Sequence, residues 1–273
     1  MNLTERKMRD LLLRGKEKYG WLAVKAEFEA EGTRMDELLR LMEIGRSAGL
    51  GLGVKIGGCE ALRDLFEAKQ IGVNYIIAPM VETDFALSKY IAAKNKAFSC
   101  DEALDTKFLF NLETITGYEN REALTELARR PGSAGVDGIV FGRSDFSGSL
   151  GLDSDAINNP EITEHILSIA QLCADNDLEL VVGGGVSVDS IPALQEIRKV
   201  CLTRFETRKV IFSAEALDSK YLKDAFLEAI QFELLWLTNK RDYYSSLQRE
   251  DEKRMSTLEE RWGGLLPPSL SEV

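Results

Sequence analysis

Short runs rich in apolar and β-branched residues alternate with longer segments of helical periodicity along most of the chain. Seven such runs are predicted as strands: 22–32, 51–58, 74–82, 107–114, 135–145, 178–187 and 204–212. Between them apolar residues recur every three or four positions, as at Met35, Leu38 and Met42, which is typical of the buried face of a helix. Strands that alternate with helices indicate βαβ units and a parallel sheet.

Seven units without a break in composition favour a closed (β/α)8 TIM-type barrel over an open doubly wound sheet. No strand is followed by GxGxxG or GxxxxGK[ST], so nucleotide-binding folds lose support. We expect the eighth strand in the N-terminal segment or near 97–100, or else an irregular closure. Residues 1–218 are assigned to the barrel, and 219–273 to a helical C-terminal extension. One helix of this extension covers the barrel, and the rest packs on a neighbouring subunit or is a solvated surface helix.

The composition is that of a globular protein with a sizeable core, with 273 residues, 44% of them hydrophobic and 29% charged. The charged N-terminal segment is unlike a signal peptide and no apolar run approaches the roughly 20 residues of a membrane helix, so a cytoplasmic location without a membrane partner is expected. The net charge of −11 argues against nucleic acid as a partner. The four cysteines are scattered, and we expect free thiols, mostly buried, in a reducing compartment.

The ends of two neighbouring predicted strands carry the strongest chemical signal. Asn111 and Glu113 share a face of the run 107–114, and Arg143 and Asp145 share a face of the run 135–145. Because parallel barrel strands direct their carboxyl ends to one face, the two carboxylates should meet there. Such a pair suits Mg²⁺ or Mn²⁺, and a metal at this place could chelate a 2-oxo acid. The alternative, an ion pair of Arg143 with Glu113, leaves Asp145 unexplained.

The first two predicted strands also end in charged residues. Lys25, Glu27, Glu29 and Glu31 alternate with small or apolar residues, so all four lie on one face of a strand. That face is either solvated or directed into the site; we expect Glu29 and Glu31 in the site, and Lys25 paired with Glu27 or with neighbours. Lys55, at the end of the next strand, either holds a substrate carboxylate or phosphate, or pairs with Glu27 or Glu29.

The last two predicted strands add candidates for anion binding. Gly183 and Gly184, in VVGGGVS, could present backbone N–H groups to a phosphate or another anion, whereas Ser187 and Asp189 could simply cap the next helix. The final run contains three polar residues in succession, of which at least one should face the barrel mouth: Thr207, Arg208 and Lys209.

Three motifs, in their order and spacing, carry a family resemblance over roughly Leu22 to Ala216. GVNYIIAPMVET, FLFNLET and GVDGIVFGRSDFSGSLG resemble the HpcH/HpaI aldolase and citrate lyase β-subunit family, the class II pyruvate aldolases with a phosphoenolpyruvate/pyruvate-domain barrel. The resemblance implies a metal-dependent barrel that makes or breaks C–C bonds next to a pyruvate, oxaloacetate or acyl-CoA enolate. It places the metal-binding residues at Glu113 and Asp145, and an amide at Asn111. It also implies a homo-oligomer, a trimer or hexamer that exchanges a C-terminal helix.

Two positions depart from that family's pattern. Lys55 stands where the family has the Arg that binds the pyruvyl carboxylate, and lysine lacks the bidentate fork. Gly32 stands where the aldolases have a His base. His165 is the single histidine and lies in a predicted helix, where a surface or packing role is expected. Glu29 or Glu31, or a metal-bound hydroxide, would then have to act as the base.

The expected function is a metal-dependent C–C lyase of the aldolase type, acting on a 2-oxo acid such as pyruvate or oxaloacetate and an aldehyde, for example a sugar. One alternative is a citryl-CoA-lyase-like enzyme, which needs a basic patch that the sequence does not show. The other is a non-catalytic barrel that binds a ligand or serves in assembly. The residues expected to carry the aldolase function are, for catalysis, Lys55, Arg143, Glu29 and Glu31; for substrate binding, Asn111, Gly183, Gly184 and Arg208; and for Mg²⁺ or Mn²⁺, Glu113 and Asp145.

Overall fold

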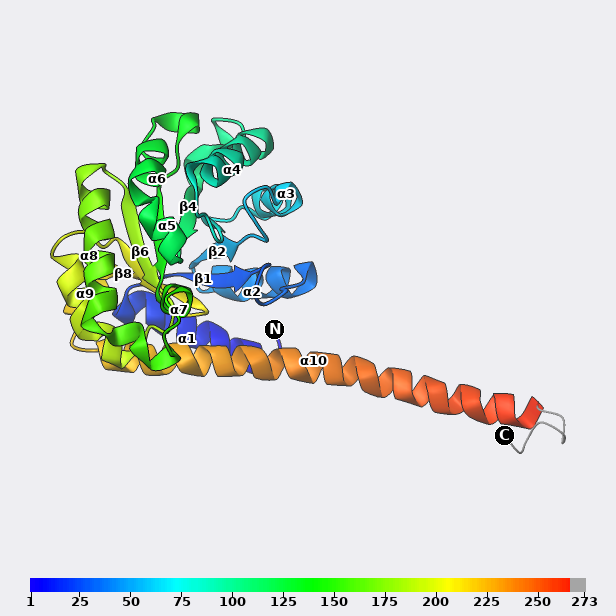
Figure 1. Ribbon diagram of the computed structural model, residues 1–273. Coiled ribbons are helices and arrows are strands. Elements are labelled where there is room, and N and C mark those ends of the chain that lie inside the picture. Colours follow the sequence, from blue (N-terminus) through cyan, green and yellow to red (C-terminus); the bar gives the residue numbers. More distant parts are fainter. Residues whose placement is uncertain (266–273) are drawn as a thin grey trace.

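Eight strands follow one another around a closed barrel in the computed structural model, which describes residues 1–265 (Figure 1). The last eight residues of the predicted C-terminal extension lie outside the described range. The strands are β1 (Trp21–Glu27), β2 (Gly51–Lys55), β3 (Tyr75–Ala78), β4 (Lys107–Leu112), β5 (Gly138–Gly142), β6 (Glu179–Gly183), β7 (Arg204–Glu206) and β8 (Val210–Ser213). The predicted (β/α)8 TIM-type class is confirmed.

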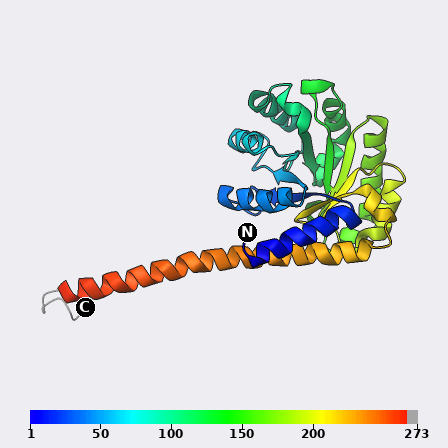
Figure 2. The same ribbon diagram turned by 180° about the vertical axis from the view of Figure 1, so that it is seen from behind.

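Helices surround this barrel, and the last of them continues far beyond it (Figures 1 and 2). They are α1 (Leu3–Tyr19), α2 (Met35–Ser47), α3 (Leu62–Ile71), α4 (Asp84–Ala97), α5 (Ile115–Glu119), α6 (Arg121–Ala128), α7 (Arg143–Ser149), α8 (Pro160–Asp175), α9 (Ile191–Arg198) and α10 (Leu222–Leu265). Over the described range, no helix combines the length and the apolar character needed to cross a membrane.

The barrel interior has three layers, because side chains two positions apart on a strand point the same way. The middle layer is a separate apolar cluster, consisting of Ile77, Leu109, Val140 and Val181. Below it, at the amino ends of the strands, Lys107 and Arg204 bind Glu179. Above it, at the carboxyl ends, lies a second charged layer. The outward residues of the strands pack with the helices in the main core.

A β-hairpin closes the barrel. Strands β1 to β7 pair in parallel, while β8 runs antiparallel to both β7 and β1. The prediction of one strand over 204–212 was therefore wrong, because the chain reverses at 207–209. The backbone N–H of Thr207 donates to the Val210 carbonyl at 2.9 Å, and the Val210 N–H donates to the Thr207 hydroxyl at 3.2 Å. This threonine turn lacks the Gly, Asn or Pro that usually announces a hairpin.

Other sequence expectations also change. The N-terminal segment, considered for the eighth strand, is helix α1, and Phe98 only caps the end of α4. Several strands end earlier than predicted, so that Glu29 and Glu31 lie in the loop after β1. The cysteines are free as expected, but Cys173 alone among them is buried.

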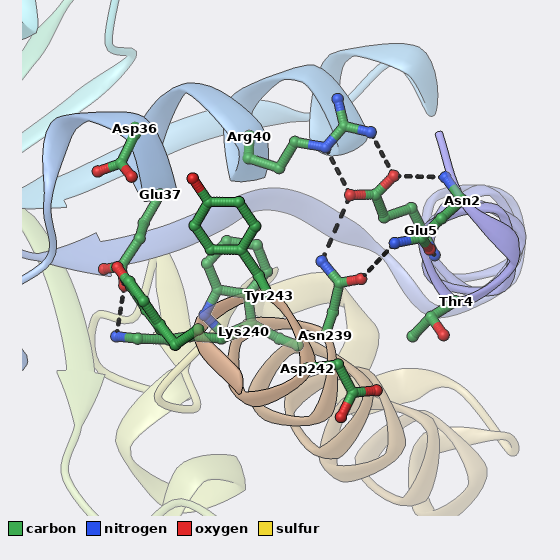
Figure 3. Close-up of a pocket in the computed structure, with 12 residues that line it drawn as sticks. Asn2, Thr4, Glu5, Asp36, Glu37, Arg40, Asn239, Lys240, Asp242 and Tyr243 are labelled. Carbon is green, nitrogen blue, oxygen red and sulfur yellow. Dashed lines mark hydrogen bonds and ion pairs between the residues drawn. The ribbon is translucent and has the colours of Figure 1, made fainter. Parts of the chain in front are cut away.

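A polar cluster holds α10 against α1 and α2 (Figure 3). Arg40 of α2 donates to Glu5 of α1 at 2.6 Å, and Asn239 of α10 donates to the same carboxylate at 3.3 Å. Asn2 completes a capping box with Glu5 and donates to Asn239 at 2.7 Å. The hydrogen bond from Arg40, together with one from the Asn2 backbone, lowers the pKa of Glu5 to about 2.

Replacing Glu5 with Gln should destabilise the fold at neutral pH. The substitution removes the charge that Arg40 pairs with, and we expect a loss of about 1–2 kcal/mol in the free energy of unfolding, reduced by salt. Because the folded pKa of Glu5 is lowered to about 2, its stabilisation is present above about pH 4.5 and is lost as pH falls toward 2. Urea unfolding of both proteins at several pH values measures this difference. A difference that stays constant from neutral to acidic pH would contradict this assignment.

Candidate active site

The upper charged layer of the barrel is built around a buried lysine. Lys25 of β1 contacts Glu27 at 3.2 Å and also binds Glu206 of β7. Burial would lower the pKa of Lys25, but Glu206 and Glu27 outweigh it and the pKa is raised. The expected pairing of Lys25 with Glu27 is confirmed. Glu206 was missed, although its place two residues after Arg204 gave it the inward direction of a strand residue.

A second lysine lies between two carboxylates at the same end of the barrel. The Nζ of Lys55 is 3.1 Å from Glu29 Oε2 and 3.5 Å from Glu113 Oε1. Burial would lower the pKa of Lys55, but the carboxylates of Glu113 and Glu29 outweigh this effect and the pKa is raised. The alternative that Lys55 pairs with Glu29 is therefore confirmed, and one ammonium group joins the end of β2 to the loop after β1 and to the residue that follows β4.

Glu113 is the most enclosed carboxylate of this layer, at 2% exposure. Its Oε2 accepts a hydrogen bond from Asn111 Nδ2 at 2.5 Å, and its Oε1 accepts one from the backbone N–H of Met80 at 3.1 Å. Burial raises the pKa of Glu113, with Lys55 and the Met80 N–H opposing the shift and Asp145 adding to it. Met80 has a φ of 50°, which is strained for a residue with a side chain, and it was not anticipated from the sequence.

Asp145 lies in a helix and not at the end of a strand. Strand β5 ends at Gly142, where a Cβ would come within 2.5 Å of Glu113 Oε2. The chain turns there into α7, whose first turn contains Asp145 with its side chain exposed. The expectation that Arg143 and Asp145 share one face of a strand was therefore wrong. The charge of Asp145 nevertheless acts on Glu113, since it contributes to the raised pKa.

Arg143 points away from Glu113, toward the turn after β6. Its guanidinium donates to the Gly184 carbonyl at 3.1 Å, to Asn158 Oδ1 at 3.0 Å and to Ser190 Oγ at 2.9 Å. None of the carboxylates within residues 1–265 pairs with it, and burial lowers the pKa of Arg143 to about 10. The alternative of an Arg143–Glu113 ion pair was therefore wrong. Asn158 and Ser190 carried no signal in the sequence.

The glycine turn after β6 packs directly against the start of α7. Gly184 has a φ of 77°, and a Cβ there would lie 2.6 Å from the backbone nitrogen of Ser144. The carbonyls of Gly183 and Gly184 face the Arg143 guanidinium, so part of this turn is occupied by the protein itself. At the start of the following short helix, the backbone N–H of Ser187 donates to Ser190 Oγ at 3.2 Å, which is one half of a capping box.

The hairpin turn supplies the remaining charges of the mouth. Lys209 binds Glu31, and Arg208 lies 3.8 Å from both Glu27 and Glu31. The Lys209 side chain is buried, whereas Arg208 is 56% exposed. The prediction that part of the segment 207–209 faces the mouth is confirmed.

His165 takes no part in this layer. The centroid of its ring lies 4.5 Å from that of Tyr118 and 5.1 Å from that of Phe146, both at steep interplanar angles. It is a packing residue between helices, as expected.

Some of the groups around Glu113 suit the binding of a hard cation such as Mg²⁺, and others do not. Asn111 Oδ1 is buried without a hydrogen-bond partner, and it belongs to the amide that bonds Glu113. Asp145 supplies a second, exposed carboxylate that acts on Glu113. Against this, the Lys55 ammonium already lies beside Glu113. Within residues 1–265, no cluster of three or more His, Cys, Asp or Glu side chains is arranged for a metal.

One cavity borders the rim near this layer. It has a volume of about 490 Å³ and lies beside the loops after β1 and β2, with Phe28, Gly32 and Gly57 among its lining residues. A larger one, of about 580 Å³, lies between α1, α2 and α10 (Figure 3). The second belongs to the polar cluster around Glu5 and is separate from the mouth.

No protein-family model matches the sequence, and no curated protein resembles it significantly. Solved structures do match. An HpcH/HpaI aldolase from Desulfitobacterium hafniense DCB-2 is 13% identical, with a TM-score of 0.57 over 76% of this chain and 84% of that one. The citrate synthase SbnG is 15% identical, with a TM-score of 0.56 over 90% of both chains.

A third match is an HpcH/HpaI aldolase/citrate lyase family protein from Burkholderia cenocepacia J2315. It is 15% identical, with a TM-score of 0.56 over 85% of this chain and 91% of that one. At these identities the likeness concerns the fold. The chain has the barrel fold of HpcH/HpaI aldolase and citrate lyase family structures.

Removing the buried Lys25 should lower the free energy of unfolding far more than removing the exposed Lys107. Lys25→Met leaves Glu27 and Glu206 without their shared cation inside the barrel, and we expect a loss of about 3–5 kcal/mol in the free energy of unfolding. Lys107 also contacts two carboxylates, but its side chain is 48% exposed, so Lys107→Met should cost about 1 kcal/mol or less. Chemical denaturation measures both. Equal losses would show that the mouth does not depend on the buried charge.

Proposed function

We propose that this chain is a carbon–carbon lyase of the aldolase type. It would join or separate a 2-oxo acid, such as pyruvate or oxaloacetate, and an aldehyde, such as a sugar aldehyde. The observation that carries the proposal is the Lys55 ammonium between Glu29 and Glu113 at the barrel mouth. Enolate chemistry needs a fixed positive charge beside a group that can move a proton. The fold shared with an aldolase and with a citrate synthase supports the same class.

The two lysines of the mouth act through charge in this proposal. Carboxylate neighbours raise the pKa of both Lys25 and Lys55, so both amines stay protonated at neutral pH. A Schiff-base aldolase needs a neutral lysine as its nucleophile. Lys55 therefore fits the stabilisation of an enolate oxygen better than covalent catalysis.

Glu29 is the best placed group for proton transfer. Its side chain is 27% exposed beside Lys55, whereas Glu31 is engaged by Lys209 and Arg208. In the cleavage direction Glu29 would take the proton from the substrate hydroxyl. The C–C bond then breaks, its electron pair forms the enolate of the 2-oxo acid, and the aldehyde is released. The enolate carbon finally takes up a proton, which regenerates the 2-oxo acid.

The arginines take different roles in substrate recognition from those expected from the sequence. The guanidinium of Arg143 is committed to carbonyl and side-chain acceptors, so we assign it to positioning the turns beside the mouth. The exposed Arg208 is free to meet a substrate carboxylate, since its contacts with Glu27 and Glu31 are long. Bidentate recognition of a carboxylate suits arginine better than Lys55.

A divalent ion, Mg²⁺ or Mn²⁺, would be held by Glu113 and Asp145, with the free amide oxygen of Asn111 as a further ligand. When bound, such an ion supplies Lewis-acid stabilisation of the 2-oxo group. The support is the unpaired Asn111 oxygen and the contribution of the Asp145 charge to the raised pKa of Glu113.

Glu113→Gln should abolish most of the activity without unfolding the protein. The change keeps the size of the side chain but removes the charge that Lys55 faces, and we expect kcat to fall by at least about 100-fold. The measurements are pyruvate release from 4-hydroxy-2-oxo acids and exchange of the pyruvate methyl protons with solvent. Glu179→Gln is the matched control, because Glu179 lies in the charged layer at the opposite end of the barrel.

Two outcomes would contradict the aldolase proposal. A wild-type protein that cleaves no hydroxy-oxo acid and exchanges no methyl protons lacks the activity. Turnover of acyl-CoA esters in place of free acids would assign the chain to the citryl-CoA-lyase class.

Metal binding can be tested without activity. Titration calorimetry with Mn²⁺ should show one site in the wild type, weakened at least about tenfold by Glu113→Gln and by Asp145→Asn, because each removes a charged oxygen ligand. Glu179→Gln again serves as control. Binding that is unchanged by both substitutions would place the ion elsewhere, and no binding at all would leave Lys55 as the cation of the site.

A further inference from the structure

The last helix extends far past everything else in the molecule. Helix α10 spans 44 residues, and Figures 1 and 2 show its second half projecting alone from the barrel. Every residue from 246 to 265 is exposed, a length of about 30 Å at 1.5 Å per residue. Most helical stability in proteins comes from packing of an apolar face and not from helix propensity, so a partner for this segment is expected on physical grounds.

The exposed side of α10 carries a stripe of large apolar side chains. Each is between 51% and 83% exposed: Leu227, Ile230, Leu234, Leu237, Met255, Leu258, Trp262 and Leu265. In the first half of the helix this stripe lies on a different side from the face that packs on the barrel, which is formed by Leu222, Ala225, Phe226, Ala229, Phe232 and Trp236. The helix is thus apolar on two sides, and the barrel covers one of them.

The stripe has the spacing of a coiled coil. Its members follow one another at alternating steps of three and four residues, and the second block, from Met255, continues the frame of the first, from Leu227. The positions between the blocks in the same frame are Arg241, Tyr244, Gln248 and Asp251. The apolar repeat is interrupted there for two heptads, and on either side of the interruption its a and d spacing keeps one seam facing another helix. It therefore specifies a helical partner.

The flanking charges select the partner and its direction. In this frame Glu252 and Glu259 occupy position e, and Arg254 and Arg261 occupy position g. In a parallel pair, position g faces position e of the next heptad in the other chain. Arg254 then meets Glu259 of a second copy. In an antiparallel pair, position g meets g and e meets e, which brings like charges together.

We propose that α10 pairs with α10 of a second copy of this chain as a parallel two-stranded coiled coil, with the stripe as its seam. Long polar side chains at position a, such as Arg241 and Gln248, suit two strands, where their ends can reach solvent. The contacts of Lys240 and Tyr244 with Glu37, at 2.9 and 2.7 Å, fix the helix on α2. Tyr244 belongs to the frame of the seam and is thereby engaged by its own barrel, so the seam open to a second copy consists of the apolar blocks on either side of it.

Charge reversal tests both the surface and the direction. In sedimentation equilibrium of the full chain we expect a dimer, which Arg254→Glu and Glu259→Arg should each weaken by about tenfold, because each creates like-charge pairs. The double variant should restore it. Lys253→Glu makes the same charge change on the outer face and should have little effect. Thermal melting confirms that each variant is folded.

A cross-link gives a second, independent readout. In a Cys100→Ser background, Leu258→Cys should form an intermolecular disulfide on mild oxidation, since equivalent residues at position d adjoin in a parallel pair. Glu260→Cys, on the outer face, should not. A monomeric wild type at high micromolar concentration would overturn the proposal. Tighter association of Arg254→Glu, or an assembly indifferent to Leu234→Glu and Leu258→Glu, would overturn it as well.

Discussion

A charge buried inside a barrel must be neutralised by groups from the barrel wall, and this requirement organises the mouth of this protein. Lys25 is nearly enclosed and depends on Glu27, on its own strand, and on Glu206, two strands away. The contact with Glu206 crosses β8, which lies between β7 and β1. The same ion pair therefore ties the ends of the barrel together and lines the mouth. Lys55 repeats the arrangement between the loop after β1 and the end of β4.

The hairpin makes closure and chemistry depend on one short segment. Glu206 ends β7, and Arg208 and Lys209 lie in the turn that follows, so all three belong to the hairpin that reverses the chain before β8. Each contacts a carboxylate or an ammonium group of β1 or of the loop after it. A conventional last unit would have a strand, a loop and a helix here, with its polar groups spread over a longer segment. In this barrel the geometry of a threonine turn sets the charge balance of the mouth.

The barrel could be predicted because alternation of strand and helix is a local property that the apolar pattern records. Glu113, Asn111 and Lys55 could be placed together for the same reason, since each ends a predicted strand. The direction of Arg143 could not be predicted, because it depends on Gly142 packing against Glu113 and on acceptors from Asn158 and Ser190 that are distant in sequence. The hairpin was missed because its turn contains no glycine or proline. Met80 was missed because its role depends on its backbone N–H and positive φ, and not on the chemistry of its side chain.

The reversed direction of β8 has a consequence for the whole molecule. The chain leaves the barrel next to Gly20, at the end opposite the mouth, because Ser213 pairs there with the start of β1. Helix α10 must then run the full height of the barrel beside α1 before it passes α2 at Glu37. Its free half consequently stands on the same side as the mouth. In two chains joined along parallel α10 helices, both barrel mouths would face the same direction, on either side of the coiled coil. A single surface or large substrate approaching from that side would then meet two sites at once.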